Sequence, residues 1–168
     1  MKPEPPSGEP PALDVLIVGA GPAGLTAGMY LARYRRRVRI VHDGSSRVLW
    51  VPRARNVPGF PDGIVGSDLI ARMSEHAIRY GTDIAEGRVI EIARGEKDEG
   101  FRARLDGGAM IAARGLILAT GVDTNLATLD GGDHRTAVQD GILRYCPICD
   151  GYEPVSYTHL TLPTICSV

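Results

Sequence analysis

The chain has 168 residues, of which 43% are hydrophobic and 5% aromatic, with 19 Lys and Arg against 20 Asp and Glu. This length and composition are typical of one α/β domain with a good core, and they exclude a full two-domain enzyme. The formal net charge of -1 creates no overall field for nucleic acid or an anionic membrane, so neither is expected as a partner.

The amino-terminal residues 1–12 are rich in proline and contain no apolar core, which excludes a signal peptide and predicts a disordered leader. No stretch approaches the ~18 apolar residues of a membrane span. The three cysteines are too few for a secreted disulfide scaffold, and two of them form a redox-type pair. We therefore expect a cytoplasmic protein.

The first predicted elements follow strand, helix, strand order. Residues 13–18 form a short apolar run that ends in glycines, as a buried parallel strand before a tight turn does. Residues 22–34 carry small and apolar side chains at helical spacing, and Pro22 is acceptable in the first turn of a helix. Residues 38–41 predict the second strand of a βαβ-like unit.

A loop, a helix and four short strands are predicted next. Residues 43–66 are rich in Pro and Gly, which predicts a long ordered loop. Ser67 is expected to cap a helix that Gly81 ends. Strands are expected at 89–93, 101–105 and 110–113, with turns at 95–100 and 106–108. A buried strand at 115–119 then leads to Thr120 and Gly121.

The glycine-rich turn after the first strand predicts a dinucleotide site. Gly19 permits the turn, Gly21 lets a phosphate approach the backbone, and Gly24 permits close packing of the helix. The helix N-terminus offers N–H groups and a partial positive charge to a pyrophosphate. The alternative is a chance glycine turn, which the strand before it and the helix after it disfavour. The predicted site comprises Gly19, Ala20, Gly21, Pro22, Ala23 and Gly24.

The ribose contact of such a site is less clear. An acidic side chain is expected about 20 residues after the glycines, directly after the second strand. His42 stands there, and Asp43 follows it. A displacement of one residue reverses the side-chain direction on a strand, although a strand end can correct this. Either residue, or neither, could bind the ribose.

Cys146 and Cys149 form a Cys-x-x-Cys pair with three possible roles. A zinc site needs two further ligands, and the chain offers only His134, His159 and Cys166. A structural disulfide is uncommon in a cytosolic protein. The redox role is preferred, because this spacing at a helix start lowers the pKa of one thiol and promotes exchange.

Asp150 directly follows the second cysteine of this pair. Its carboxyl could exchange a proton with a departing thiolate, or it could be a plain helix-start carboxylate. His76, on the polar face of its helix, and His134, in an expected loop, are assigned no role. The arginines at 33–39 are interpreted as a solvated helix end.

With these residues in hand, the chain resembles the thioredoxin reductase family of flavoproteins over about residues 13–153. The resemblance rests on four ordered motifs: residues 19–27, the loop 56–61 with sequence NVPGFP, residues 118–121 with sequence LATG, and the run from Cys146 through Asp150 to Gly151-Tyr152. It implies a Rossmann-like FAD-binding domain with three ββα layers. In that fold, FAD would contact the Gly19 to Gly24 turn, His42 or Asp43, Asn56, Thr120 and Gly121.

The resemblance also implies roles in electron transfer. Cys149 would face the flavin, Cys146 would exchange with a partner protein, and Asp150 would act as acid and base. Members of the family usually carry Glu or Asp where His42 stands, so the ribose contact departs from the family pattern.

A larger departure from the family pattern follows Glu153. No second glycine fingerprint for NADPH and no return to the first domain follow, and residues 154–168 look like a translated sequencing-adapter tail. We expect a FAD-binding domain at 13–123 that lacks this return, the start of a NAD(P)H and dithiol domain at 124–153, and a foreign tail. The chain would then be truncated at the start of a second nucleotide-binding domain.

The expected parent protein is a homodimeric FAD enzyme that passes electrons from NADPH to the Cys146/Cys149 pair and on to a thioredoxin-like protein or a small disulfide. One alternative is a dithiol oxidase in which oxygen reoxidises the flavin. Another is an inactive flavin-binding fragment, which the absent second fingerprint favours.

Overall fold

The computed structural model describes residues 13–95, 100–123, 125–126 and 133–146. Several predicted features lie outside these residues. They are the leader at 1–12, most of the turn at 95–100, Cys149, Asp150 and the tail at 154–168. The chain divides into two compact units, one of residues 1–46 and 71–121 and the other of residues 47–70 and 122–168.

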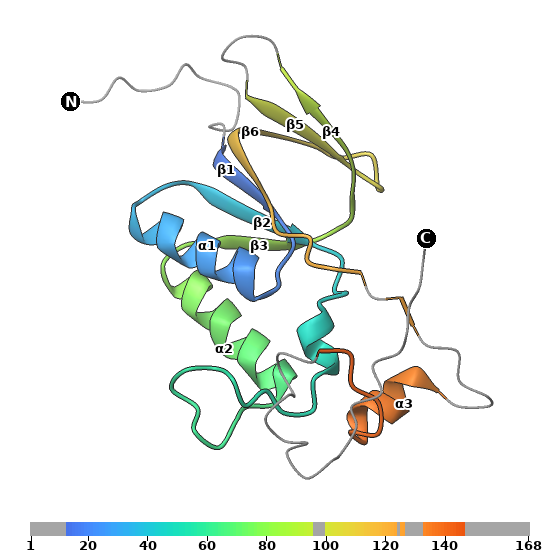
Figure 1. The fold of residues 1–168 in the computed structure, drawn as a ribbon. Helices are drawn as coiled ribbons and strands as arrows, with labels where there is room; N and C mark the ends of the chain where they lie inside the picture. Colours follow the sequence, from blue (N-terminus) through green and yellow to red (C-terminus); the bar gives the residue numbers. More distant parts are fainter. Residues whose placement is uncertain (1–12, 96–99, 124, 127–132, 147–168) are drawn as a thin grey trace. The chain divides into compact units, whose positions relative to one another are not determined.

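The first unit contains one six-stranded sheet (Figure 1). Its order is β3-β2-β1-β6-β5-β4. The pairs β1–β2, β1–β6 and β2–β3 are parallel, whereas β4–β5 and β5–β6 are antiparallel. The strands are β1 (Leu13–Val18), β2 (Val38–His42), β3 (Asp83–Glu86), β4 (Val89–Arg94), β5 (Phe101–Leu105) and β6 (Met110–Leu118).

The long strand β6 belongs to both halves of this sheet. Its first part pairs antiparallel with β5, from Met110 opposite Arg104 to Ala113 opposite Phe101. Its second part pairs parallel with β1, as far as Leu118 opposite Val18. Ala113 has a partner on both edges, so the antiparallel strands and the parallel strands meet at this residue.

Helix α1 (Pro22–Arg33) lies against β1 and β2 and covers one face of the parallel strands (Figure 1). Leu25 is buried on the helix, and Ile17 and Ile40 are buried on the strands. Gly28 permits this close approach, because a Cβ at that position would lie 2.8 Å from Cδ1 of Ile40. The small residues in the helical pattern therefore serve to seat α1 on the sheet.

The opposite face of the sheet carries a second core. Leu16 of β1 and Val41 of β2 cluster with Ala103 of β5 and Ala113 of β6, all of them buried. Ala103 lies on a strand three places away from β2 in the sheet order, so the antiparallel strands fold back over the parallel ones. This arrangement gives antiparallel, parallel and helical layers, and it confirms the predicted three-layer ββα domain.

The second unit contains short elements. The 3-10 helix η1 (Arg47–Trp50) begins it, and Ala54 and Ile64 form an isolated antiparallel bridge. Helix α3 (His134–Gln139) contacts η1. Asp133 caps α3, because its carboxylate accepts hydrogen bonds from the backbone N–H and the hydroxyl of Thr136 at 2.9 and 2.8 Å. Helix α2 (Gly66–Arg79) begins in this unit and ends in the other.

Several expected elements are confirmed within one or two residues, namely β1, α1, β2, β4 and β5. Other expectations are wrong. Ser67 lies inside α2, which begins at Gly66. The segments 110–113 and 115–119 form one strand, β6. Both β3 and α3 were missed, so His134 is in a helix instead of a loop. The loop 43–66 also contains η1.

Among the described residues, no helix is both long enough and apolar enough to cross a membrane.

Candidate functional site

The candidate cofactor site lies at the carboxyl ends of the parallel strands. β1 ends at Val18, and the adjacent β6 ends at Leu118, directly opposite it. The backbone N–H of Gly19 donates to the carbonyl of Val41 on β2 at 2.8 Å, and that of Ala119 donates to the carbonyl of Val18, also at 2.8 Å. The glycine turn, the end of β2 and the Thr120 turn therefore share one sheet edge, where open α/β sheets bind ligands.

Gly19 and Gly24 are required by the backbone itself. Gly19 has a φ of 107°, which side chains other than glycine rarely adopt, and a Cβ there would overlap the carbonyl of Ala119. A Cβ at Gly24 would overlap the carbonyl of Gly19 and lie 3.3 Å from Cβ of Ala119. These two glycines let α1, the turn and the end of β6 come into contact.

Gly21 has different surroundings. It precedes α1 with φ -76° and ψ -179°, an extended conformation that any residue can adopt. Among the described residues, a Cβ at this position would meet only the Ser46 hydroxyl, at 3.6 Å. These residues therefore leave the space over Gly21 open.

The N-terminus of α1 adds donors to this space. No side chain caps it, and its first turn contains no acidic residue. The first N–H groups of a helix have no partner within the helix, and an anion is the partner that the helix dipole favours. Open space beside uncapped donors fits the pyrophosphate of a dinucleotide, with Ala20, Pro22 and Ala23 completing the turn.

His42 and Asp43 follow the same sheet edge. His42 is the last residue of β2, and its Nδ1 accepts a hydrogen bond from the Gly44 N–H at 3.1 Å. Asp43 is exposed and accepts hydrogen bonds from the hydroxyl and the N–H of Ser45, the latter at 3.0 Å. These bonds lower the pKa of Asp43, and the charge of Arg88 adds to the effect.

The ribose expectation thus remains a prediction for both residues. Asp43 is fixed by Ser45, while Nε2 of His42 is the ring nitrogen that the Gly44 bond does not use. Ser45 and Ser46 were not singled out from the sequence, although an Asp followed two residues later by Ser is a signal for such a turn.

Thr120 and Gly121 form the second turn at this edge. Both are exposed, and Gly121 has a φ of 76° with open space where a Cβ would be. Ala119 was not predicted as a site residue, although it contacts the glycine turn through its backbone and its methyl group.

The second unit holds the other predicted residues that the structure describes. Asn56 is exposed and lines a shallow hollow of about 330 Å³ formed by residues 55–61. Cys146 is half-buried and forms a disulfide. In the described part of the chain, no three His, Cys, Asp or Glu side chains gather as a metal-ligand cluster.

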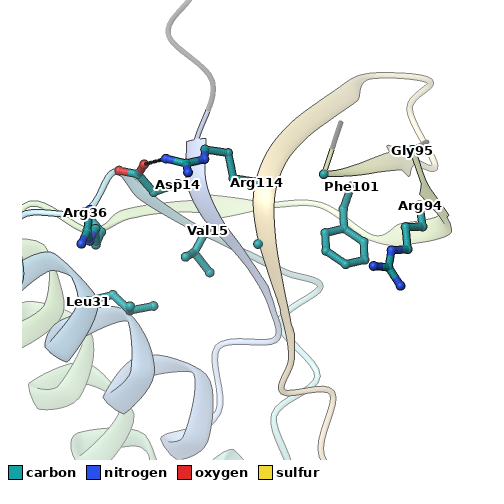
Figure 2. A pocket seen from close by; sticks show the side chains of 10 residues that line it. Asp14, Val15, Leu31, Arg36, Arg94, Gly95, Phe101 and Arg114 are labelled. Carbon is teal, nitrogen blue, oxygen red and sulfur yellow. Dashed lines mark ion pairs between the residues drawn. The ribbon is translucent and has the colours of Figure 1, made fainter. Parts of the chain in front are cut away.

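A larger hollow of about 910 Å³ lies elsewhere in the first unit (Figure 2). It is lined by Asp14 and Val15 at the start of β1 and by Arg36 after α1, whereas the glycine turn follows the carboxyl end of β1. Figure 2 shows the ion pair between Asp14 and Arg114, which spans 3.7 Å. We assign this hollow no part in the cofactor site.

Comparison with known proteins identifies the family. Residues 13–153 match the model of the pyridine nucleotide-disulphide oxidoreductase family. A thioredoxin reductase from Listeria monocytogenes is 32% identical over 140 residues, covering 82% of this chain and 42% of the relative. Thioredoxin reductase 1 from Saccharomyces cerevisiae is 33% identical over 150 residues, covering 84% of this chain and 46% of the relative.

Solved structures agree with this match. The crystal structure of thioredoxin reductase from Streptococcus pyogenes superposes with a TM-score of 0.74 at 28% identity, covering 83% of this chain and 44% of that one. The chain thus spans less than half the length of the relatives that it matches. With the family model covering residues 13–153, and with the sheet and glycine turn described above, the chain belongs to the pyridine nucleotide-disulphide oxidoreductase family.

Proposed function

We propose that this chain is the flavin- and dithiol-bearing part of a dithiol-disulfide oxidoreductase. Electrons pass from NADPH through FAD to the Cys146/Cys149 pair, and then to a thioredoxin-like protein or a small disulfide. The observation that carries this proposal is the disulfide at Cys146, which lies within the segment that matches the family. An oxidised cysteine suits an electron acceptor better than it suits a zinc ligand.

The turn at the end of β1 supports FAD as the cofactor. The uncapped N-terminus of α1 and the open space over Gly21 would hold the pyrophosphate, and the end of β2 would hold the ribose. Asn56, Thr120 and Gly121 would contact other parts of the cofactor. When bound, FAD would supply two-electron transfer between a nicotinamide and a disulfide.

The two cysteines have different roles in the reduction of the partner disulfide. Reduction of the disulfide adds two electrons and two protons and yields two thiols. The Cys146 thiolate then attacks one sulfur of the partner disulfide, forming a mixed disulfide and releasing the other sulfur as a thiolate. Cys149 attacks Cys146 and frees the reduced partner, and Asp150 supplies or accepts the proton.

The remaining parts of the proposal concern the whole protein. The thioredoxin reductases among the relatives support a thioredoxin-like partner. NADPH would bind to a second glycine fingerprint, which residues 1–168 do not contain. A homodimer in the cytoplasm, with no nucleic acid or membrane partner, remains our prediction.

The test uses the complete protein under anaerobic conditions. NADPH should bleach the flavin absorbance of both the parent and the Cys146→Ser variant, because Cys146 is not the thiol that faces the flavin. Turnover of a thioredoxin-like disulfide should stop in the variant, because the electrons lose their exit. Ser67→Ala, at an exposed position outside the predicted site, is the control and should retain full turnover.

Normal turnover by Cys146→Ser would refute the assigned role. A flavin that NADPH does not bleach, but that a small dithiol reduces and oxygen reoxidises, would identify the protein as a dithiol oxidase instead.

A further inference from the structure

His134 has an unusual environment beside the dithiol segment. Its Nε2 is buried and makes no hydrogen bond to any residue that the structure describes, and its ring stacks on that of Tyr145. The ring centroids are 6.4 Å apart and the planes differ by 21°, within the range of offset-stacked aromatic pairs. No hydrogen bond of this nitrogen therefore sets the position of the ring.

The backbone holds His134 in place. It is the first residue of α3, directly after the Asp133 cap, and α3 contacts η1. The cap fixes the start of the helix, and the contact with η1 fixes the helix within its unit. The imidazole of His134 is therefore attached to backbone whose position is fixed.

Tyr145 is the residue directly before Cys146, and consecutive Cα atoms are 3.8 Å apart. A ring that holds Tyr145 therefore also restrains the backbone that carries Cys146. The structure contains the stack and the Cys146 disulfide together. The stack is thus compatible with the disulfide geometry, whereas two free thiols would not require that geometry.

We propose that His134 is a positioning residue for the dithiol: by stacking on Tyr145 it holds Cys146 where the disulfide forms. This inference rests on the proposed function, in which Cys146 and Cys149 alternate between disulfide and thiols. Restraining one cysteine raises the effective concentration of its thiol at the other, which favours the disulfide. Loss of the stack should make the disulfide easier to reduce.

The experiment is a redox titration of the chain with dithiothreitol. Protein disulfide and reduced dithiothreitol exchange with protein dithiol and oxidised dithiothreitol, and the thiols are counted by alkylation and mass spectrometry. No Lys or Arg follows Arg144, so one tryptic peptide would hold all three cysteines. All variants therefore carry Cys166→Ser, which leaves Cys146 and Cys149 as the only thiols.

His134→Ala removes the ring and should shift the half-reduction point to a roughly two- to ten-fold lower ratio of reduced to oxidised dithiothreitol, the range that the strength of an aromatic pair implies. His134→Phe keeps a ring without the nitrogen and should restore the parent ratio. His76→Ala is the matched control, because His76 and Tyr80 form another His–Tyr pair, in the first unit, with ring centroids 5.5 Å apart. It should leave the ratio unchanged.

A double-mutant cycle with Tyr145→Ala checks the contact independently of any general loss of folding. His134→Ala should have no further effect once Tyr145 is alanine. Additive effects, an unchanged ratio in His134→Ala, or a shift in His134→Phe equal to that in His134→Ala would each overturn the proposal. The titration needs neither flavin nor NADPH, so such a result would leave the proposed electron path to be judged by its own test.

Discussion

The three glycines of the turn after β1 have different roles, and mutation can distinguish a role in folding from a role in binding. Gly19 and Gly24 are required by backbone contacts with each other and with Ala119. Gly21 is in an extended conformation beside open space, so the fold tolerates a side chain there while a bound pyrophosphate would not. Substitution of Gly21 should therefore affect flavin binding, whereas substitution of Gly19 or Gly24 should affect the stability of the fold.

Gly21→Val should abolish flavin binding by the chain and leave the urea unfolding midpoint close to that of the parent. Gly24→Ala should lower the midpoint, because its methyl group overlaps the Gly19 carbonyl, at a cost of about 1–3 kcal/mol for overpacking. Flavin content is measured by absorbance of the dialysed protein. Equal flavin content in Gly21→Val and the parent would refute the assignment of the turn.

A second residue-scale prediction concerns Asp14, whose carboxylate is mostly buried with 18% of the side chain exposed. It accepts a hydrogen bond from the Arg37 N–H at 2.8 Å, and this bond lowers its pKa, with the charges of Arg37, Arg36 and Arg114 adding to the effect. A lowered pKa in the folded state stabilises the protein above the unfolded pKa of ~3.9, and this stability is lost as the pH falls through the folded pKa.

Asp14→Asn should therefore cost about 1 kcal/mol of unfolding free energy at pH 7, and the difference from the parent should shrink as the pH falls below ~3.9. Urea denaturation at a series of pH values measures this. Asp83→Asn is the control, because Asp83 pairs with Arg39 at the surface with 51% of its side chain exposed, and such pairs contribute little. A difference between Asp14→Asn and the parent that is constant with pH would contradict the prediction.

At the scale of the elements, the start of α2 shows a residue that sequence reasoning misplaced. Ser67 looks like a helix cap but is exposed inside the helix, whereas the buried Gly66 begins it. A Cβ at Gly66 would overlap the carbonyl of Val48 and lie 2.9 Å from that of Val51. The entry of α2 is thus set by backbone packing against the segment that contains η1.

Ser67→Ala should change the unfolding free energy by less than about 0.5 kcal/mol, whereas loss of a true cap costs about 1 kcal/mol. Gly66→Ala should be destabilising by more than about 1 kcal/mol, because the new methyl group meets backbone that cannot move away. Thermal or urea unfolding of the two variants separates these cases. A loss of about 1 kcal/mol of unfolding free energy in Ser67→Ala would instead show that Ser67 caps the helix.

The strands and helices that the sequence predicted well are those with a strong local signal. β1 is an apolar run before glycines, and α1 has helical spacing over twelve residues. β3 has only four residues, Asp83–Glu86, with charged ends, and its parallel pairing with β2 is a long-range contact that no local pattern records. β6 was predicted as two strands, 110–113 and 115–119, although it is continuous because its partner changes from β5 to β1.

The candidate site likewise has parts that the local sequence predicts and parts that depend on long-range contacts. The glycine turn could be predicted because its roles depend on a short stretch of backbone. The contact of Ala119 with Gly19 and Gly24 could not, because it joins two strand ends about a hundred residues apart in the sequence. Helix α3 left one signal that was not used, since Asp133 and Thr136 have the spacing of a helix cap.

For the whole molecule, we predict that the chain of 168 residues has no NADPH-dependent disulfide reductase activity. Hydride transfer needs the nicotinamide held against the flavin, and such positioning can lower a barrier by about 7–11 kcal/mol. Residues 122–168 contain no second glycine fingerprint that could hold it.

The measurement mixes the chain with FAD, NADPH and a thioredoxin-like disulfide and follows the absorbance of NADPH. Cys149→Ser serves as the control. A steady oxidation of NADPH that disappears in this variant would contradict the prediction, because it would show that the chain itself positions the nicotinamide.

Because β6 joins the antiparallel strands to the cofactor edge, the domain should tolerate insertions very unevenly. The turn at residues 106–108 is exposed, with open space around Gly107 and Gly108, so extra residues there would leave the sheet intact. A single residue inserted within β6 would instead shift Ala119 by ~3.3 Å and turn the alternate side chains to the opposite face. Loop length can therefore vary in this domain, whereas the count of residues from Met110 to Gly121 is fixed by the geometry of the glycine turn.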